Sequence, residues 1–286
     1  MANLKEIRNR ISSVKSTMQI TSAMKMVSAA KLKKAQDAIT AMRPYANKLT
    51  ELLQSLSSTL DDEFGSRYAQ QRDVKKVLIV AITSNRGLCG AFNSNIIKEA
   101  TQLIEDDYAG FSNQVITLGK KGNDILSKSE DVLMNNNEIF DDLTFENVAE
   151  IAQTLMDKFE QGECDKIILV YNSFKNAATQ IIRTEQFLPV EPVEMDPSVH
   201  LDYIFEPSEA EIVEELYPKS LKIQLYKAIR DSFASEHGAR MTAMHKATES
   251  AKEMRDELTL SYNKARQAAI TGEILEIVGG AEALKE

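Results

Sequence analysis

The segment from Ile82 to Asn93 holds the first candidates for chemistry in this sequence. It reads Ile-Thr-Ser-Asn-Arg-Gly-Leu-Cys-Gly-Ala-Phe-Asn and lies between an apolar run and a predicted helix. Such a junction binds phosphate in some proteins, because the amide groups at a helix N-terminus attract anions. Its glycine spacing matches neither G-x-G-x-x-G nor G-x-x-x-x-G-K-S/T. A structural turn in which Asn93 or Ser94 caps the helix is the favoured interpretation, and a phosphate site is the alternative.

Two cysteines and three histidines are the other candidate groups. Cys89 and Cys164 lie far apart among apolar residues, which predicts two buried free thiols in a reducing compartment. A nucleophilic Cys89 is the weaker alternative, since no histidine lies near it in the sequence to act as a base. His200, His237 and His245 have no metal-ligand spacing with either cysteine. We therefore expect no catalytic residue, no metal site and no cofactor in this chain.

The elements around this loop form a predicted α/β domain. Apolar runs predict strands, amphipathic stretches predict helices, and the two kinds alternate along the chain. The predicted strands are 75–82, 114–118, 166–171 and 180–185, and the predicted helices are 94–104, 120–127 and 145–159. This alternation predicts a small, mostly parallel, Rossmann-like sheet with helices around it.

One long helix is predicted before this domain. Gly65 is the first glycine, and residues 1–60 are rich in alanine, lysine, methionine and leucine, which favour helices. Its apolar residues form a stripe in two regular stretches. Between them the register of the stripe is predicted to slip, and the stripe continues through Ile20, Met24 and Val27 after a break. Such a helix of about 58 residues would be roughly 85–90 Å long. Its apolar residues recur at alternating spacings of three and four, as in a coiled coil: Leu4, Ile7, Ile11, Val14 and Met18, then Ile39, Met42, Ala46, Leu49, Leu53, Leu56 and Leu60.

A second long helix is predicted after Pro207. The two helices flank one compact domain, so the chain leaves along one helix and returns along the other. The predicted fold is therefore a long antiparallel two-helix coiled coil with an inserted Rossmann-like α/β domain, divided at residues 1–60, 61–208 and 209–286. The stripe of the second helix is Met241, Met244, Ala247, Ala251, Met254, Leu258, Tyr262, Ala265 and Ala269.

The charge of the chain is unevenly distributed. Its net charge is −9, yet residues 1–60 hold 10 basic and 3 acidic side chains. A basic helix can bind nucleic acid, but here basic residues alternate with an apolar seam and almost no aromatic residues lie between them. We expect a solvated face or an acidic protein partner rather than nucleic acid. Neither an apolar run long enough to span a membrane nor a secretory signal is evident, so we expect membrane attachment only through partners.

Three stretches resemble the gamma subunit of F-type ATP synthases. The first is IRNRI at residues 7–11, followed by TSAMKMVSAAK at 21–31. The second is SNRGLCGAFN at 84–93, and the third joins residues 235–244 to YNKARQAAIT at 262–271 and Glu273-Ile274. The resemblance covers both ends and the middle of the chain. One departure is Asn85, where the family usually has aspartate.

The resemblance implies a mechanism that the residues alone do not. The paired helices would be a shaft inside a ring of alternating alpha and beta subunits, and the globular domain would bind the epsilon subunit and the membrane ring of c subunits. This chain would transmit torque, while catalysis would belong to beta. The absence of the cysteine-bearing insertion of the chloroplast type implies a bacterial protein, peripheral on the cytoplasmic face of the inner membrane.

Individual contacts are carried over from the resemblance in the same way. Met24 and Lys25 match the contact with beta-subunit loops, and Arg266 and Gln267 match the positions facing them. A register that pairs residues whose numbers add up to about 290 would place Met24 close to Arg266. Further positions tied to coupling are Arg240, Thr271 and Glu273, and the expected foot on the rotor ring and epsilon is Tyr203, Phe205 and Glu206.

Two other functions remain open on the residues alone. The chain would be a stand-alone coiled-coil scaffold carrying an α/β module, or a nucleic-acid-binding protein that uses its basic helix. The chains that copurify with it separate these possibilities, since a rotor subunit brings stoichiometric alpha and beta subunits and a nucleic-acid binder brings salt-sensitive nucleic acid.

Overall fold

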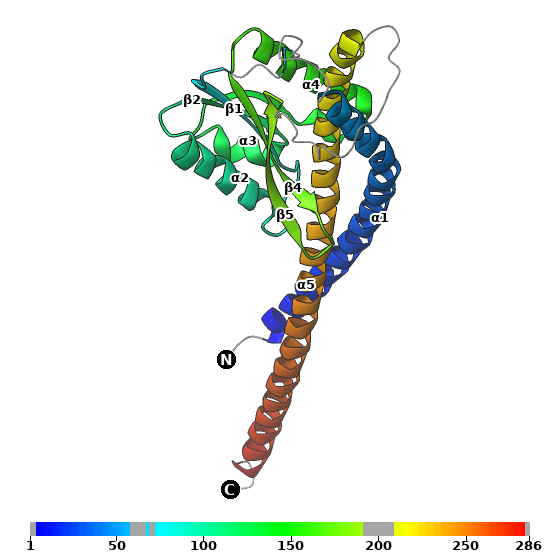
Figure 1. Ribbon diagram of the computed structural model, residues 1–286. Coiled ribbons are helices and arrows are strands. Elements are labelled where there is room, and N and C mark those ends of the chain that lie inside the picture. The colour runs from blue at the N-terminus through cyan, green and yellow to red at the C-terminus, as the bar shows by residue number, and fades with distance from the viewer. Residues whose placement is uncertain (1–3, 58–66, 69–71, 191–208, 284–286) are drawn as a thin grey trace. The chain divides into compact units, whose positions relative to one another are not determined.

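The computed structural model describes residues 4–57, 67–68, 72–190 and 209–283 (Figure 1). The chain forms two compact units, one of residues 1–28 with 241–286 and one of residues 29–240. The helices are α1 (Leu4–Ser57), α2 (Phe92–Gln102), α3 (Lys120–Leu126), α4 (Phe145–Glu160) and α5 (Glu209–Ala283), with a π-helical turn at Leu103–Asp107 and a 3-10 turn at Glu138–Phe140. The strands are β1 (Lys76–Ile82), β2 (Ser112–Leu118), β3 (Val132–Asn136), β4 (Lys166–Phe174) and β5 (Gln180–Leu188).

The five strands form one mixed sheet inside the unit of residues 29–240. Their order is β3-β2-β1-β4-β5, with every neighbouring pair parallel except β4 and β5, which are antiparallel. The central strand β1 is buried from Val77 to Ile82. A strand buried on both faces needs an unbroken apolar run, and Val-Leu-Ile-Val-Ala-Ile supplies it.

Helices cover both faces of this sheet. On one face, Val77, Ile79 and Ala81 share a core with side chains of α2 and α3. On the other face, Leu78, Val80 and Ile82 share a core with α4 and with the α5 residues Leu221, Leu225, Ala228 and Ile229. The first segment of α5 is therefore part of the α/β core. The division at residues 1–60, 61–208 and 209–286 stays a prediction, and the compact units cut both long helices instead.

Most of the predicted elements are present. The predicted fold class of two long terminal helices around a small α/β sheet is confirmed, as are the strands and helices assigned between residues 75 and 185. Strand β3 was missed. It lies at the edge of the sheet, its five side chains are half-buried or exposed, and it ends in two asparagines, so it has no strong apolar pattern.

The two long helices owe their continuity to composition. Helix α1 has 54 residues without a glycine, and α5 has 75 residues. At 1.5 Å per residue these lengths correspond to roughly 80 Å and 110 Å. Pro44 lies inside α1 and Pro218 inside α5, and neither ends its helix.

Candidate functional site

The unit of residues 1–28 and 241–286 is an antiparallel helix pair. Arg8 Nη2 donates to Tyr262 Oη at 2.6 Å, and the Thr21 and Thr248 hydroxyl oxygens lie 2.7 Å apart. Lys25 Nζ lies 3.3 Å from His245 Nδ1. In each pair the two residue numbers add up to 269 or 270.

The register of about 290 is therefore wrong. Met24 lies beside the turn around His245 rather than near Arg266, which is 21 residues farther along α5. At 1.5 Å per residue the displacement is about 30 Å. The error arose because no residue pair in the sequence fixes the register, whereas the hydroxyl pair in the structure does.

The seam of α1 also differs from the prediction. Ile20 and Val27 are 60% and 58% exposed, so the stripe does not slip onto them. The least exposed positions continue the spacing of three and four without a break, as Met18, Thr21, Lys25 and Ser28. The seam was missed because its central members are polar. On α5 the half-buried positions include Thr248 and Arg255 beside the predicted Ala247, whereas the predicted Met254 is 53% exposed and Ala269 is exposed.

The coil residues expected to contact a partner occupy two separate places. Met24 and Lys25 are half-buried on α1, and Lys25 shares its contact with His245. Arg266, Gln267, Thr271 and Glu273 are exposed on α5. The expected foot residues Tyr203, Phe205 and Glu206 lie outside the described residues.

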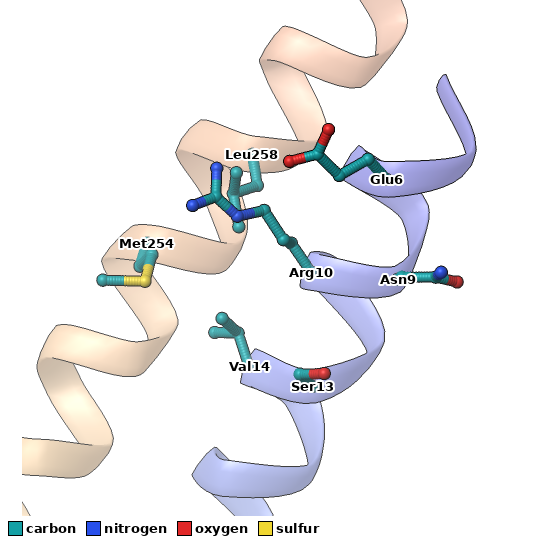
Figure 2. Close-up of a pocket in the computed structure, with 7 residues that line it drawn as sticks. All are labelled: Glu6, Asn9, Arg10, Ser13, Val14, Met254 and Leu258. Carbon is teal, nitrogen blue, oxygen red and sulfur yellow. The ribbon is translucent and has the colours of Figure 1, made fainter. Parts of the chain in front are cut away.

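A shallow groove of about 460 Å³ lies between the two helices of this unit. Its lining is mainly apolar, and Figure 2 shows Val14 and Met254 beside it, with Arg10 reaching from α1 toward Leu258. The groove holds one carboxylate, from Glu6, and one guanidinium, from Arg10.

The loop after β1 lies in the other unit and is tied together at its base. The Ser84 backbone amide donates to Asn93 Oδ1 at 2.9 Å, and Asn93 Nδ2 lies 2.9 Å from Ser84 Oγ. Helix α2 begins at Phe92, after Ala91, and no side chain caps it. The prediction of Asn93 or Ser94 as the helix cap is wrong, because the Asn93 amide bridges back to Ser84 instead.

The tip of this loop has an unusual backbone. Leu88 has φ of +62° and is 64% exposed, and Gly90 also has φ of +62°. A left-handed conformation costs a side-chain-bearing residue roughly 1–2 kcal/mol. The surrounding contacts must therefore hold Leu88 in place.

Arg240 of α5 supplies such contacts. Its Nη2 donates to the Arg86 carbonyl at 3.0 Å and to the Gly87 carbonyl at 3.3 Å. Its Nη1 donates to Glu236 Oε1 at 2.6 Å, with both side chains buried. A phosphate-binding loop presents amide N–H groups, whereas this loop turns two carbonyls toward its own chain's cation. The geometry favours the structural interpretation of the loop over the phosphate site.

Burial sets the protonation of the groups around Arg240. It raises the pKa of the Glu236 carboxyl, while the adjacent Arg240 opposes that rise. It lowers the pKa of His237 to about 3, with repulsion from Arg240 and Lys31 acting in the same direction. His237 is therefore neutral, and its Nδ1 lies 3.4 Å from Arg240 Nη1. The cluster is thus a buried ion pair beside a neutral imidazole.

The two thiols have no activated neighbour. Cys89 and Cys164 are both free and buried, as predicted. Burial raises the pKa of Cys89, although Arg240 opposes it, and raises the pKa of Cys164 to about 11. A protonated thiol is a poor nucleophile, which argues against a catalytic Cys89. Within the described ranges, no three His, Cys, Asp or Glu side chains gather as a metal site, and no helix is long and apolar enough to cross a membrane.

Comparison with known proteins places this architecture in a family. A family model described as ATP synthase matches residues 3–284. The ATP synthase gamma chain of Flavobacterium psychrophilum is 71% identical over 286 residues, covering 100% of both chains. This chain belongs to the ATP synthase gamma-chain family. The gamma chain of Christiangramia forsetii is 68% identical over 284 residues, covering 99% of each chain. The expected resemblance, including its bacterial type, is confirmed.

Solved structures agree with that assignment. A chain of the central stalk and c-ring structure of the Tetrahymena thermophila mitochondrial ATP synthase is 26% identical to this one, with a TM-score of 0.58. The match covers 80% of this chain and 99% of that chain. A chain from the Euglena gracilis mitochondrial enzyme shares the fold at 22% identity and a TM-score of 0.70, over 98% of this gamma-family chain and 94% of its own length.

Proposed function

We propose that this chain is the torque-transmitting shaft of an ATP synthase. It connects the proton-driven membrane ring of c subunits to the catalytic ring of alpha and beta subunits, and it takes part in assembly, coupling and regulation. One observation carries the proposal. In this member of the gamma-chain family, the last segment of the 75-residue helix α5 is exposed. Ile270, Ile274, Leu275, Ile277 and Val278 are 48–72% exposed there. Apolar surface of this extent is typical of a partner interface.

The exposed side of α1 supports the same partner. Ile20, Met26 and Val27 are 58–65% exposed next to the expected contact residues Met24 and Lys25. They belong to a basic segment, since residues 1–60 hold 10 basic and 3 acidic side chains. Apolar side chains on a basic helix suit an acidic protein surface, which the beta-subunit loops of this family provide.

The proposed contacts with the alpha and beta ring are therefore exposed or half-buried coil residues. They are Met24, Lys25, Arg266, Gln267, Thr271 and Glu273. Arg240 was also expected among them; it is 6% exposed, and we propose that it acts on the ring through its own chain. Contacts of the foot residues Tyr203, Phe205 and Glu206 with the c-ring and the epsilon subunit complete the proposal.

The remaining assignments follow from the shaft function. Catalysis belongs to the beta subunits, so the chain needs no cofactor of its own. It binds the membrane only through its partners and lies on the cytoplasmic face of the bacterial inner membrane. Nucleic acid is not a partner.

Sealed vesicles that contain the purified complex test this function. Alpha and beta subunits are expected to copurify in stoichiometric amounts, and ATP-driven proton uptake is expected to depend on the chain. Removal of residues 1–40 should abolish coupled ATP synthesis, because it removes most of one shaft helix. Retention of coupled synthesis by that truncated complex would overturn the shaft function. A lone dimer of the chain would favour the scaffold instead.

A further inference from the structure

Arg240 occupies a particular place along α5. It is the last residue of that helix inside the unit of residues 29–240, and Met241 begins the other unit. Its guanidinium reaches the loop after β1, which is more than 150 residues away in the sequence. The Arg86 and Gly87 carbonyls and the Glu236 carboxylate accept its hydrogen bonds at 2.6–3.4 Å. Arg240 thus joins the loop after β1 to the α5 segment of the same unit.

Most of the attachment between the sheet and α5 is apolar. Leu221, Leu225, Ala228 and Ile229 lie in the common core, and apolar burial is not directional. Directional links occur at intervals along the helix. Gln224 donates to the Gln186 carbonyl at 3.2 Å, and Arg230 donates to the Leu143 carbonyl at 2.6 Å. Arg240 ends this series, and its side chain is the most deeply buried of the three.

The burial of Arg240 requires a balancing anion. A buried guanidinium without a partner is costly, because it loses its hydration. Glu236, one turn earlier on α5, supplies the anion with both side chains less than 10% exposed. Two guanidinium nitrogens, Nε and Nη2, then remain free to hold the loop. A lysine at this position would offer one point charge and no planar fork.

The tip of the loop has a strained backbone, although Ser84 holds the Arg86 carbonyl from within the loop at 2.6 Å. Leu88 has a left-handed backbone and an exposed side chain, and a Cβ added at Gly87 would meet no atom within 4 Å. Beneath the loop, Cys89 packs with Phe92 and with Ala239 of α5. Cys89 is 2% exposed with the loop against α5, and we expect its exposure to rise if the loop moves away. Its accessibility is therefore a direct measure of whether the loop is closed.

We propose that Arg240 is a positioning residue that fixes the loop of residues 84–90 on α5, so that the sheet and the α5 segment of the same unit turn as one body. The mechanical part of this inference rests on the proposed shaft function, and the closed loop does not. Glu236 positions Arg240, and Arg240 positions the loop. Load that reaches the sheet unit then passes to α5 through directional bonds instead of through apolar packing alone.

Thiol modification of the full-length chain tests the loop. Arg240→Ala is expected to raise the rate of Cys89 modification roughly tenfold to a hundredfold, because hydrogen bonds to a charged group contribute that much to a closed state. Cys164 is the internal control, since it is also buried but has no contact with Arg240. Glu236→Gln is expected to have a smaller effect, because the amide oxygen still accepts from Arg240.

Arg230→Ala is the matched control variant. It removes a guanidinium that also holds a backbone carbonyl from α5, but on the segment before α4. It is expected to leave the Cys89 rate unchanged. An unchanged Cys89 rate in Arg240→Ala would overturn the inference. Equal acceleration of Cys89 and Cys164 would also overturn it, because the whole sheet unit would then be opening.

The complex in sealed vesicles tests the mechanical part. Arg240→Ala is expected to lower the number of protons pumped per ATP hydrolysed, and Arg240→Lys is expected to restore it only in part. If Arg240→Ala accelerates Cys89 modification but leaves proton pumping undiminished, the mechanical role of Arg240 is overturned and the shaft function stays intact. A complex that lacks this chain tests the shaft function separately. If it pumped protons as well as the complete complex, the shaft function would fail, whatever the Cys89 result.

Discussion

The hydroxyl of Thr21 on α1 and the hydroxyl of Thr248 on α5 are hydrogen-bonded at 2.7 Å within the seam of the helix pair. Thr248 Oγ1 also lies 2.8 Å from the Met244 carbonyl. One consistent arrangement has Thr248 donate to that carbonyl and accept from Thr21. Polar groups buried in a coiled-coil seam specify register, because a shifted pairing leaves them without partners. This pair therefore fixes which turns of α1 and α5 meet.

Disulfide cross-linking between α1 and α5 tests that register. Thr21→Cys with Thr248→Cys is expected to cross-link on mild oxidation, since the replaced oxygens are in contact. Lys25→Cys with Gln267→Cys is the matched pair and is expected not to cross-link. Gln267 lies 22 residues beyond His245, which is about 33 Å along a helix. Mass spectrometry of the oxidised full-length variants identifies the product. Cross-linking of the second pair alone would restore the register of about 290.

Sequence patterns predicted the elements far better than the contacts between them. The run Val77–Ile82 is apolar throughout because β1 is buried on both faces, so the strand was evident. The seam was misplaced because Thr21 and Ser28 lie inside it, while Ile20 and Val27 lie outside. When the exposed face of a helix also carries apolar residues, periodicity no longer identifies which apolar face is buried. The contact of Arg240 with Arg86 had no local signal, since 154 residues separate them.

Asn85 uses both ends of its side-chain amide to hold neighbouring loops. Its Nδ2 donates to the Asn137 carbonyl at 2.8 Å, and its Oδ1 accepts from the Lys120 amide at 3.0 Å. Asn85→Asp is expected to lower the free energy of unfolding by about 1–2 kcal/mol, because a carboxylate would face the carbonyl without a donor. Denaturant unfolding measures this change. Asn95→Asp, which adds the same charge in the exposed first turn of α2, is expected to be neutral or slightly stabilising.

Gly119 is required where two loops cross. Its φ is +109°, and an added Cβ would lie 2.5 Å from the Thr83 carbonyl oxygen. Gly119→Ala is expected to lower the free energy of unfolding by roughly 2–6 kcal/mol, from backbone strain together with overpacking. Gly110 has φ of +89° with open space around it, so Gly110→Ala is expected to cost about 1–3 kcal/mol from strain alone. Equal losses in thermal unfolding would contradict the close approach.

His237 makes stability depend on pH. Burial holds its pKa at about 3 in the folded chain, whereas an unfolded histidine titrates near 6.5. As pH falls below about 6.5 the unfolded state takes up a proton that the folded state refuses. The contribution of His237 is therefore complete above that pH and is lost on acidification at about 1.4 kcal/mol per pH unit.

Comparison with His237→Gln isolates this contribution. The raised pKa of Glu236 acts in the opposite direction, because the folded state then binds a proton first. That effect is present in both proteins and cancels in their difference. The free energy of unfolding of the variant is expected to fall less steeply than that of the wild type between about pH 6 and pH 4. Parallel curves over this range would show that His237 is not buried as a neutral group.

Ile277 separates folding from assembly. Its side chain is 72% exposed, so Ile277→Gln is expected to change the free energy of unfolding of the isolated chain by less than about 0.5 kcal/mol. In the complex the same variant is expected to weaken coupled ATP synthesis, because it places an amide against the surrounding subunits. Ile79→Ala, at a fully buried position, is the contrasting variant and is expected to cost about 2–5 kcal/mol. A large loss of stability in Ile277→Gln would show that the chain itself covers this residue.

The exposed end of α5 also distinguishes assembled copies of the chain from unassembled ones. From Arg266 to Ala281 every residue except the half-buried Gly272 is exposed, so no described helix of the unit covers this stretch. A lone helical segment of that length is close to its melting point in water, so a surplus copy opens there first and offers apolar residues to proteases and chaperones. Copies enclosed by other subunits are shielded from this. Quality control can therefore distinguish orphaned from incorporated subunits by residues 266–281.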